Sequence, residues 1–238
     1  MKWCNDATGR FTQRPYYLEE ELDHLCETII VQHLERYCGE VVLPVPTNAL
    51  TTLIECDADD LDVYADLTAE GPDVEGMTEF IRGKLPRVKI ASTLTTNSQR
   101  EHRLRTTLAH EYGHVHFHAP LFERREPTSG LFLDTETTNR QVCQRRTILR
   151  AKQSDWMEWQ AGFCCGALLM PATGTRRAVV DYLDATGMPC PVYESSTEGA
   201  HLTARIAEMF NVSSEAAQIR LSRLGYLVRH GLTPTLVR

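Results

Sequence analysis

The sequence predicts an α+β fold in which a small sheet packs on a long helix and further helices follow. Short segments with loosely alternating apolar residues indicate strands, and they come before the helix, at Leu61–Thr68, Met77–Ile81 and Arg87–Ile90. Two strong helical patterns come later, at Gln99–His118 and Ser154–Leu169. Because strands and helices occupy separate stretches instead of alternating, the pattern is typical of the α+β class.

The composition is that of an ordinary globular protein. The 238 residues are 42% hydrophobic and 24% charged, which excludes a mainly disordered chain. A net charge of -7 gives no overall field that would attract nucleic acid. No apolar run approaches the ~20 residues that cross a bilayer, and the N-terminus lacks the apolar core of a signal peptide. We therefore expect a soluble, cytoplasmic protein without a membrane span.

The eight cysteines show no metal-binding pattern. None forms a CxxC pair, and the adjacent Cys164 and Cys165 could not both reach one tetrahedral ion without awkward geometry. In a cytosolic chain such cysteines are mostly small buried hydrophobes, and that is what we expect here.

Further helices flank this region on both sides. A helix over Tyr16–Tyr37 is ended by Gly39, and a short helix capped by Thr47 follows over residues 47–54. Another short helix is predicted near residues 177–183. The C-terminal part carries two helices joined by a short turn, at His201–Phe210 and Ser214–Leu224. We expect one domain over residues 15–175 and a C-terminal, helix-turn-helix-like segment over residues 176–238 packed on it.

The helix over Gln99–His118 has its own start and stop signals. Ser98 and Glu101 form a capping-box pattern, in which each side chain can bond the other residue's amide. Pro120 is expected to end the helix. The polar, arginine-rich stretch that follows contains a predicted strand pair, at Gly130–Leu133 and Arg140–Leu149.

This helix carries the motif His110-Glu111-Tyr112-Gly113-His114. Two histidines at positions i and i+4 project from one helix face, and their spacing suits a tetrahedral zinc ion. The glutamate beside the first histidine can take a proton from the metal-bound water and pass it to the leaving amine. Gly113 keeps the backbone bare, so that a strand or the substrate can approach closely. The motif therefore predicts a zinc-peptidase site with His110 and His114 as ligands and Glu111 as general base.

A zinc-peptidase site needs a third protein ligand, and Glu158 is the strongest candidate. It lies at the head of the otherwise apolar face of the second helix, where a carboxylate is costly to bury without a cation. The alternative is an acid favoured at a helix N-terminus by the helix dipole. Rival ligands by residue type are His116, His118 and His201. Of these, His118 lies one turn beyond His114 and suits a supporting role behind the ligands.

Two segments carry motifs of a known family. They are RLRTTLAHEYGH in the first helix and EWQAGFCCGALLMP in the second, accompanied by Pro44-Val45-Pro46 upstream and Phe210-Asn211-Val212-Ser213 downstream. With them the chain resembles the ImmA/IrrE family of metallo-endopeptidases over most of residues 16–226. The resemblance implies a zincin-like domain with Zn²⁺ as cofactor. It also implies the site residues, with His110, His114 and Glu158 as metal ligands and Glu111 as catalytic base.

The resemblance also implies a biological role. Well-studied members cleave a helix-turn-helix repressor and so switch on genes of mobile elements or of the DNA-damage response. Two departures from the family pattern bear on the site and its substrate. Gly162 stands where relatives have Asn or Asp, which would remove a hydrogen bond behind the ligands. The stretch between His114 and Glu158 is longer than in compact members, and its inserted hairpin could shape the choice of substrate.

Two other functions remain open from the sequence. The C-terminal helices have a helix-turn-helix cadence, so a DNA-binding or regulatory interaction module is an alternative. Only Arg220 and Arg223 supply positive charge to the second of these helices, and an acidic chain lacks the basic face of a DNA reader. A metal-binding sensor with little proteolysis is the other alternative, because its ligands and base would look the same.

Overall fold

A computed structural model describes residues 1–123, 138–144 and 148–229 of the chain. The chain divides into two compact units, each assembled from two stretches of sequence. Unit 1 comprises Met1–Leu22 and Thr47–Cys165, and unit 2 comprises Asp23–Pro46 and Gly166–Arg238. The domain boundary expected near residue 175 stays a prediction. Among the described residues, no helix has both the length and the apolar character needed to cross a membrane.

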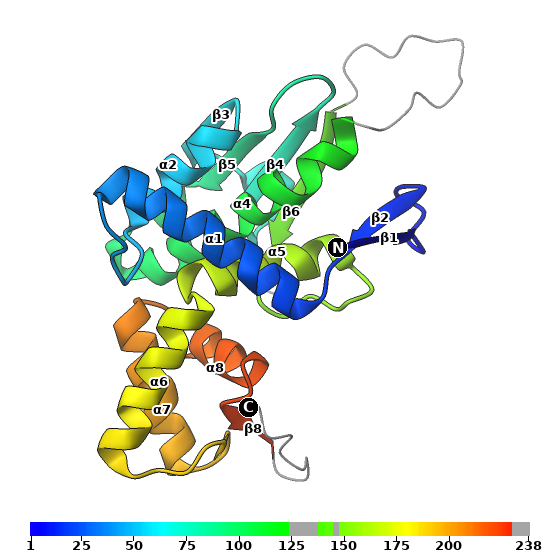
Figure 1. Cartoon of the computed structure of the whole chain (residues 1–238). Coiled ribbons are helices and arrows are strands. Elements are labelled where there is room, and N and C mark those ends of the chain that lie inside the picture. Colours follow the sequence, from blue (N-terminus) through cyan, green and yellow to red (C-terminus); the bar gives the residue numbers. More distant parts are fainter. Residues whose placement is uncertain (124–137, 145–147, 230–238) are drawn as a thin grey trace, which may run out of the picture. The chain divides into compact units, whose positions relative to one another are not determined.

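Unit 1 contains the predicted sheet. Its four strands run in the order β3 (Asp60–Ala65), β5 (Arg87–Ala91), β4 (Val74–Ile81) and β6 (Thr138–Gln144) (Figure 1). Strand β3 pairs with β5 in parallel, and the other two pairings are antiparallel. The mixture of a small sheet with helices agrees with the predicted α+β class. The sheet's edge strand, β6, overlaps the predicted strand over 140–149, whereas 130–133 lies outside the described residues.

The helix that carries the His-Glu motif is α4 (Glu101–Glu123), which follows a short 3-10 turn, η2 (Ser98–Arg100). The predicted capping box is wrong, because the cap is one residue earlier. The Asn97 side chain accepts a hydrogen bond from the Gln99 amide at 3.0 Å, and Glu101 instead accepts one from the Thr47 hydroxyl at 3.0 Å. An asparagine oxygen serves as well as a serine oxygen at this position, so the local pattern allowed both.

Pro120 lies inside α4 and does not end it, contrary to the prediction. A proline so near the end of a helix removes one backbone hydrogen bond. The turn that follows gains apolar burial in return, since Leu121 and Phe122 pack in a cluster with Phe80, Trp156 and Met157. Tertiary packing therefore extends the helix to Glu123.

The second predicted helix is α5 (Trp156–Leu169), which belongs to unit 1 as far as Cys165 and packs very closely on α4 there. A Cβ atom added to Gly113 would lie 2.9 Å from the Cα of Ala161 and 3.2 Å from the Cβ of Cys164. The bare backbone at Gly113 thus admits the neighbouring helix, and not a strand or the substrate as the sequence suggested. Position 162 must also be glycine in this packing, because a Cβ atom added there would lie 2.3 Å from the carbonyl oxygen of Ile148. An Asn or Asp at this position would need that carbonyl to move.

The remaining elements of unit 1 surround the sheet and the two helices. They are the antiparallel hairpin β1 (Lys2–Asn5) and β2 (Gln13–Tyr16), helix α2 (Thr47–Asp57), the 3-10 turn η1 (Thr68–Glu70) and the short helix α3 (Ser92–Thr95). Helix α2 packs on α4 through the buried side chains of Ala49, Leu50, Leu53 and Ile54. The short helix expected over 47–54 is therefore present and three residues longer.

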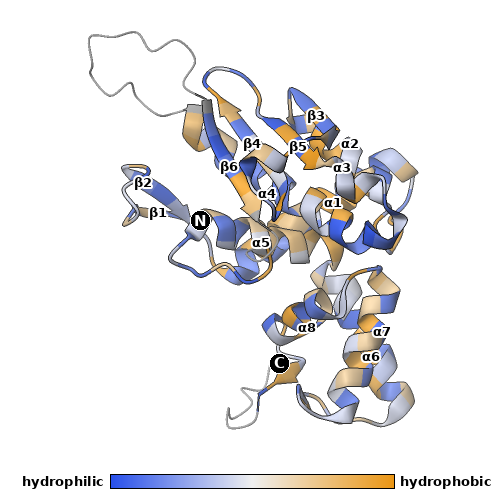
Figure 2. Ribbon diagram, turned by 180° about the vertical axis from the view of Figure 1, so that it is seen from behind, coloured by the Kyte–Doolittle hydropathy of each residue, from blue (hydrophilic) through white to orange (hydrophobic). Residues whose placement is uncertain are grey.

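Unit 2 consists mainly of helices. It contains most of α1 (Glu19–Cys38), then α6 (Ala172–Thr186), α7 (Thr197–Phe210) and α8 (Ser214–Arg223), with the two-residue parallel strands β7 (Val192–Tyr193) and β8 (Leu227–Val228). Hydrophilic and hydrophobic residues alternate along α7 (Figure 2), whose buried positions recur at helical spacing. Helix α6 is longer than the helix expected over 177–183 and ends at Gly187, which adopts a left-handed conformation (φ +67°).

A buried charge fixes α8 within unit 2. The Arg220 side chain is 2% exposed, forms an ion pair with Asp23 at 2.6 Å and donates a hydrogen bond to the Met170 carbonyl at 3.0 Å. One of the two arginines that could have contacted DNA from this helix is thus directed inward. The observation weakens the DNA-binding alternative.

Candidate metal centre

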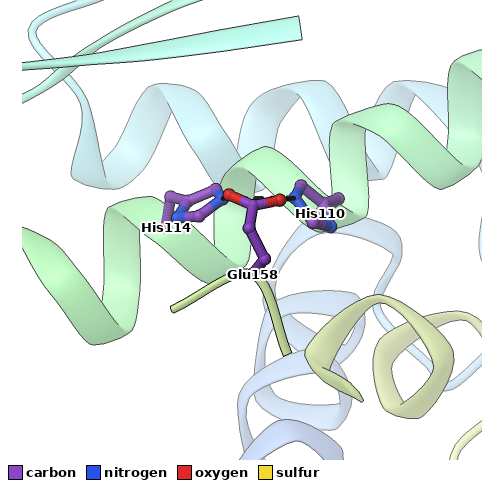
Figure 3. A group of neighbouring side chains, drawn as sticks. All are labelled: His110, His114 and Glu158. Carbon is purple, nitrogen blue, oxygen red and sulfur yellow. Dashed lines mark hydrogen bonds and ion pairs between the residues drawn. The ribbon is translucent and has the colours of Figure 1, made fainter. Parts of the chain in front are cut away.

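Three side chains from two helices meet inside unit 1. His110 and His114 lie one turn apart on α4, and Glu158 comes from the first turn of α5. The two Nε2 atoms are 3.2 Å apart, while the Glu158 oxygens lie 3.2 Å from His110 Nε2 and 3.1 Å from His114 Nε2. Figure 3 shows the carboxylate between the two rings, with one oxygen toward each. The residues predicted as metal ligands are therefore brought together in space.

The geometry and chemistry of this group fit a metal ion. A tetrahedral ion at ~2.0–2.1 Å from its ligands separates them by about 3.3–3.4 Å, close to the distances found here. Glu158 Oε2 is buried, and its one partner among the described residues is His110 Nε2, at 3.2 Å. A buried carboxylate is costly unless positive charge faces it, and a metal ion between the two atoms would supply that charge. Two imidazoles and a carboxylate, 0–4% exposed, make up the donor set of a catalytic zinc site.

The electrostatics of the group follow from its burial. Burial alone would raise the pKa of Glu158, but the two imidazoles, His114 first, lower it far below its ordinary value. In the same way burial would lower the pKa of His114, yet the Glu158 carboxylate raises it above its ordinary value. The Glu158 carboxylate and the imidazole beside it thus stabilise each other's charged form. A metal ion bound between them would take the place of the positive charge.

A chain of hydrogen bonds stands behind His114. Its Nδ1 lies 2.9 Å from Nδ1 of His118, whose Nε2 lies 3.2 Å from the Gln160 side-chain oxygen. The Gln160 amide nitrogen donates in turn to the Pro15 carbonyl at 3.1 Å. Burial and the neighbouring His114 hold the pKa of His118 well below its ordinary value, so its ring is neutral. His118 can then donate from Nε2 and accept at Nδ1, which leaves the proton of His114 on Nδ1 and frees its Nε2 for the metal.

Glu111 lies beside this group and is fully buried. The Thr78 hydroxyl on β4 donates a hydrogen bond to its Oε2 at 2.6 Å, and no described residue donates one to its Oε1. Burial raises the pKa of Glu111 above its ordinary value, against the opposing effects of the two histidines and Thr78. A carboxylate that is oriented through one oxygen and has a raised pKa has the properties of a general base.

Gly76, a residue outside every motif of the sequence, makes room for this carboxylate. A Cβ atom at Gly76 would lie 2.4 Å from Glu111 Oε1 and 2.8 Å from the Thr107 methyl group. The sequence does offer one sign of this role: Gly76 lies inside a strand, and a glycine there often marks a place where another group approaches the backbone closely.

Replacing Gly76 by alanine is expected to displace the Glu111 carboxylate while leaving the metal ligands in place. A displacement of about 1 Å in a catalytic group can slow a reaction on the order of 10²-fold. Steady-state cleavage rates measured at equal metal content would check this. Gly166→Ala is the matched control, because its added Cβ would make only one ordinary contact, at 3.9 Å. Equal rates for the Gly76→Ala variant and the wild type would contradict the assigned position of Glu111.

Strand β6 supplies two residues of the site that the sequence did not reveal. Its register with β4 places Cys143 opposite Gly76 and Gln141 opposite Thr78. Because alternate residues of a strand share one face, Gln141 and Cys143 both face the helices. The Gln141 amide donates a hydrogen bond to Glu158 Oε1 at 2.6 Å. The Cys143 thiol, a ring nitrogen of His110 and a carboxylate oxygen of Glu111 lie within 4.8 Å of one another.

None of the three rival ligands belongs to this group of donor atoms. His116 stacks on Tyr112 and lies 4.0 Å from Asp57, on another side of α4. Tyr112 itself is buried and donates a hydrogen bond to Asp57 at 2.9 Å. His118 supports His114, as its position suggested, and His201 is an exposed residue of unit 2.

Comparison with known proteins bears on the same region. The family model described as the IrrE N-terminal-like domain, of peptidase family M78, matches residues 94–222. No curated protein matches the chain. The matched region contains both helices of the site and covers more than half of the sequence. The chain belongs to the ImmA/IrrE (M78) family of metallopeptidases.

Proposed function

We propose that this protein is a zinc-dependent endopeptidase with His110, His114 and Glu158 as the metal ligands and Glu111 as general base. The observation that carries the proposal is the trio of donor atoms 3.1–3.2 Å apart, beside a buried carboxylate of raised pKa. Zinc is the metal that this set of two imidazoles and one carboxylate favours, in a zincin-like site that keeps a fourth position open.

The chemistry divides between the metal and the protein. A bound zinc ion would polarise the scissile carbonyl and lower the pKa of a water molecule. Glu111 takes a proton from that water through Oε1, the oxygen that makes no other hydrogen bond to described residues, and delivers it to the leaving amine. Thr78 holds the opposite oxygen, so the carboxylate stays oriented throughout. Gln141 holds Glu158, and His118 holds His114, each by a hydrogen bond to the ligand.

The family membership implies a protein substrate. We propose that the substrate is one specific regulatory protein, a helix-turn-helix repressor encoded beside this chain. The support is the resemblance to family members that cleave such repressors and thereby regulate transcription. The 4% exposure of the only ligand that is not completely buried favours a selective enzyme over a general digestive one, because few chains could enter such a site.

Metal removal provides the test of this function. We expect the zinc-loaded protein to cut the purified repressor, encoded by the neighbouring gene, at one defined peptide bond. Treatment with a chelator should abolish cleavage and added zinc should restore it, because binding energy and catalysis both depend on the ion. Mass spectrometry of the products would locate the cut, and an unrelated helix-turn-helix repressor serves as the control substrate.

Three results would decide against parts of the proposal. Cleavage that survives complete removal of metal would exclude a metallopeptidase mechanism. An intact repressor in the presence of the zinc-loaded protein would exclude that substrate. Stoichiometric zinc without cleavage of any tested repressor would favour the alternative of a metal-binding sensor.

A further inference from the structure

The segment that joins β1 to β2, residues 6–12, is connected to the metal centre by hydrogen bonds. Arg10, an exposed residue of this segment, donates from Nη1 to the Gln141 side-chain oxygen at 3.1 Å. The Gln141 amide nitrogen donates in turn to Glu158 Oε1 at 2.6 Å. One amide group therefore links Arg10 to a proposed metal ligand, although 131 positions of sequence separate Arg10 from Gln141.

The 6–12 segment is anchored to α5. The buried Asp6 carboxylate accepts hydrogen bonds from the Trp156 indole at 3.1 Å and from the Phe11 amide at 3.0 Å. The Phe11 ring lies edge-on to that of Trp156, with ring centroids 6.1 Å apart. Arg10 also contacts this helix directly, because its Nη1 donates to the Met157 sulfur at 2.9 Å. The segment is thus fixed to the first turn of α5, the turn that carries the proposed ligand.

The direction in which the Gln141 amide faces matters for the ligand. An amide turned by 180° would place its oxygen against the Glu158 carboxylate, and two acceptors cannot bond each other. A guanidinium has only donors, so Arg10 holds the amide oxygen on its own side and leaves the nitrogen to Glu158. The positive charge also polarises the amide, which strengthens the hydrogen bond that its nitrogen donates.

We infer that Arg10 is a positioning residue of the metal centre, which orients Glu158 through Gln141. The inference rests on the proposed metal site of His110, His114 and Glu158. Glu158 Oε1, which receives the Gln141 hydrogen bond, is the oxygen that lies 3.1 Å from His114 Nε2. Its direction therefore sets how well the carboxylate and this imidazole can share one ion, and metal affinity depends on such groups behind the ligands.

A double-mutant cycle in cobalt(II) binding tests this role. The metal-free protein is titrated with cobalt(II), whose affinity and visible absorption bands both depend on the arrangement of its ligands. Gln141→Ala removes the connecting amide and should weaken binding by about 10–100-fold. Arg10→Ala is expected to weaken binding by roughly 3- to 10-fold more in the wild type than in the Gln141→Ala protein. It should also shift the absorption bands of the wild type but not those of the Gln141→Ala protein.

The cycle separates the hydrogen-bonded connection from the charge of Arg10. Removing a positive charge near a cation site favours metal binding, which opposes the loss of the hydrogen bond. This effect of charge acts through space, so it is present whether or not Gln141 is there. The ratio of the two Arg10→Ala effects therefore reports the connection through the amide alone.

Arg140→Ala is the matched control. Arg140 precedes Gln141 on β6 and is exposed like Arg10, but it pairs with Glu70 at 3.1 Å and Glu79 at 3.3 Å. Its replacement should change cobalt affinity by the same factor with and without Gln141.

Three results would overturn the inference and leave the proposed peptidase site standing. They are equal effects of Arg10→Ala in the two proteins, wild-type absorption bands that Arg10→Ala leaves unchanged, and a dependence on Gln141 that is as large for Arg140→Ala. Failure of the wild type to bind cobalt at all would overturn the proposed metal site itself, and the inference with it.

Discussion

Replacing Glu111 by glutamine is expected to abolish cleavage while the metal stays bound. Glutamine keeps the size of the side chain and can still accept a hydrogen bond from Thr78, but it cannot take a proton from water. Loss of a positioned general base slows reactions by about 10²- to 10⁴-fold. Neither His110, His114 nor Glu158 is altered, so zinc content should not change.

The same substitution is expected to stabilise the metal-free protein at neutral pH. Burial raises the pKa of Glu111 above its ordinary value of 4.5, so the folded protein holds this proton more tightly than the unfolded chain. Its contribution to stability is then fully present below pH 4.5 and is lost as the pH rises through the folded-state pKa. Above that pKa the wild type carries a buried charge that glutamine lacks.

Two measurements on the Glu111→Gln protein check these expectations. Single-turnover cleavage with equal zinc content reports the loss of the base. Thermal unfolding of metal-free protein across a pH series reports the stability difference, which should be largest at neutral pH and vanish under acid conditions. Undiminished cleavage would show that Glu111 is not the base. A variant less stable than the wild type at every pH would contradict the raised pKa.

Replacing Glu158 by glutamine is expected to remove the metal and all activity with it. The carboxylate supplies the only negative charge among the three proposed ligands, and a neutral amide is a poor zinc ligand. The loss of affinity should exceed the roughly 10–100-fold that follows when a group behind a ligand is removed. The Gln141 hydrogen bond and the packing of α5 can persist, since the shape of the side chain is kept.

Zinc competition with a chelating dye would measure this loss. Glu79→Gln is the control, because Glu79 is another buried carboxylate of unit 1 that pairs with Lys89 at 3.2 Å and Arg140 at 3.3 Å, outside the metal group. Its zinc affinity should match that of the wild type. Wild-type affinity in the Glu158→Gln protein would exclude Glu158 as a ligand and reopen the question of the third ligand.

The two predictions separate the roles that the proposal assigns to two buried carboxylates. Both lie beside His110 and His114, yet the histidines lower the pKa of Glu158 far below its ordinary value while burial raises that of Glu111. Two neighbouring acids with pKa values shifted in opposite directions suit a permanently charged ligand and a proton acceptor. A metal-binding sensor would need the first carboxylate and have no use for the second.

Local periodicity was enough to predict the helical part of the site. His110 and His114 face the same way because a helix turns every 3.6 residues, and Glu111 is carried next to them by the same backbone. The helix containing Glu158 was found from its apolar face, and its end at Leu169 is as predicted. The small sheet before α4 was also predicted, because the strands carry their own alternating pattern.

Local signals failed where contacts with other parts of the chain decide the outcome. Asn97 and Ser98 are both good caps, and in the structure Asn97 takes the role while Glu101, the partner that Ser98 would need, accepts a hydrogen bond from the Thr47 hydroxyl. Pro120 disfavours helix by itself, but the burial of Leu121 and Phe122 outweighs it. The role of Gly113 was likewise decided by Ala161 on the neighbouring helix.

By itself, the sequence determined the family, the α+β class and the face of α4 that carries the proposed ligands, because each depends on residues close together in the chain. Only the tertiary structure brought Glu158 to the two histidines, placed Thr78 and Gly76 at Glu111, and set Cys143 beneath the metal centre. These placements depend on helix packing and on the register of β6 against β4. A register shift of one residue would turn Cys143 and Gln141 to the opposite face, and no local pattern encodes that choice.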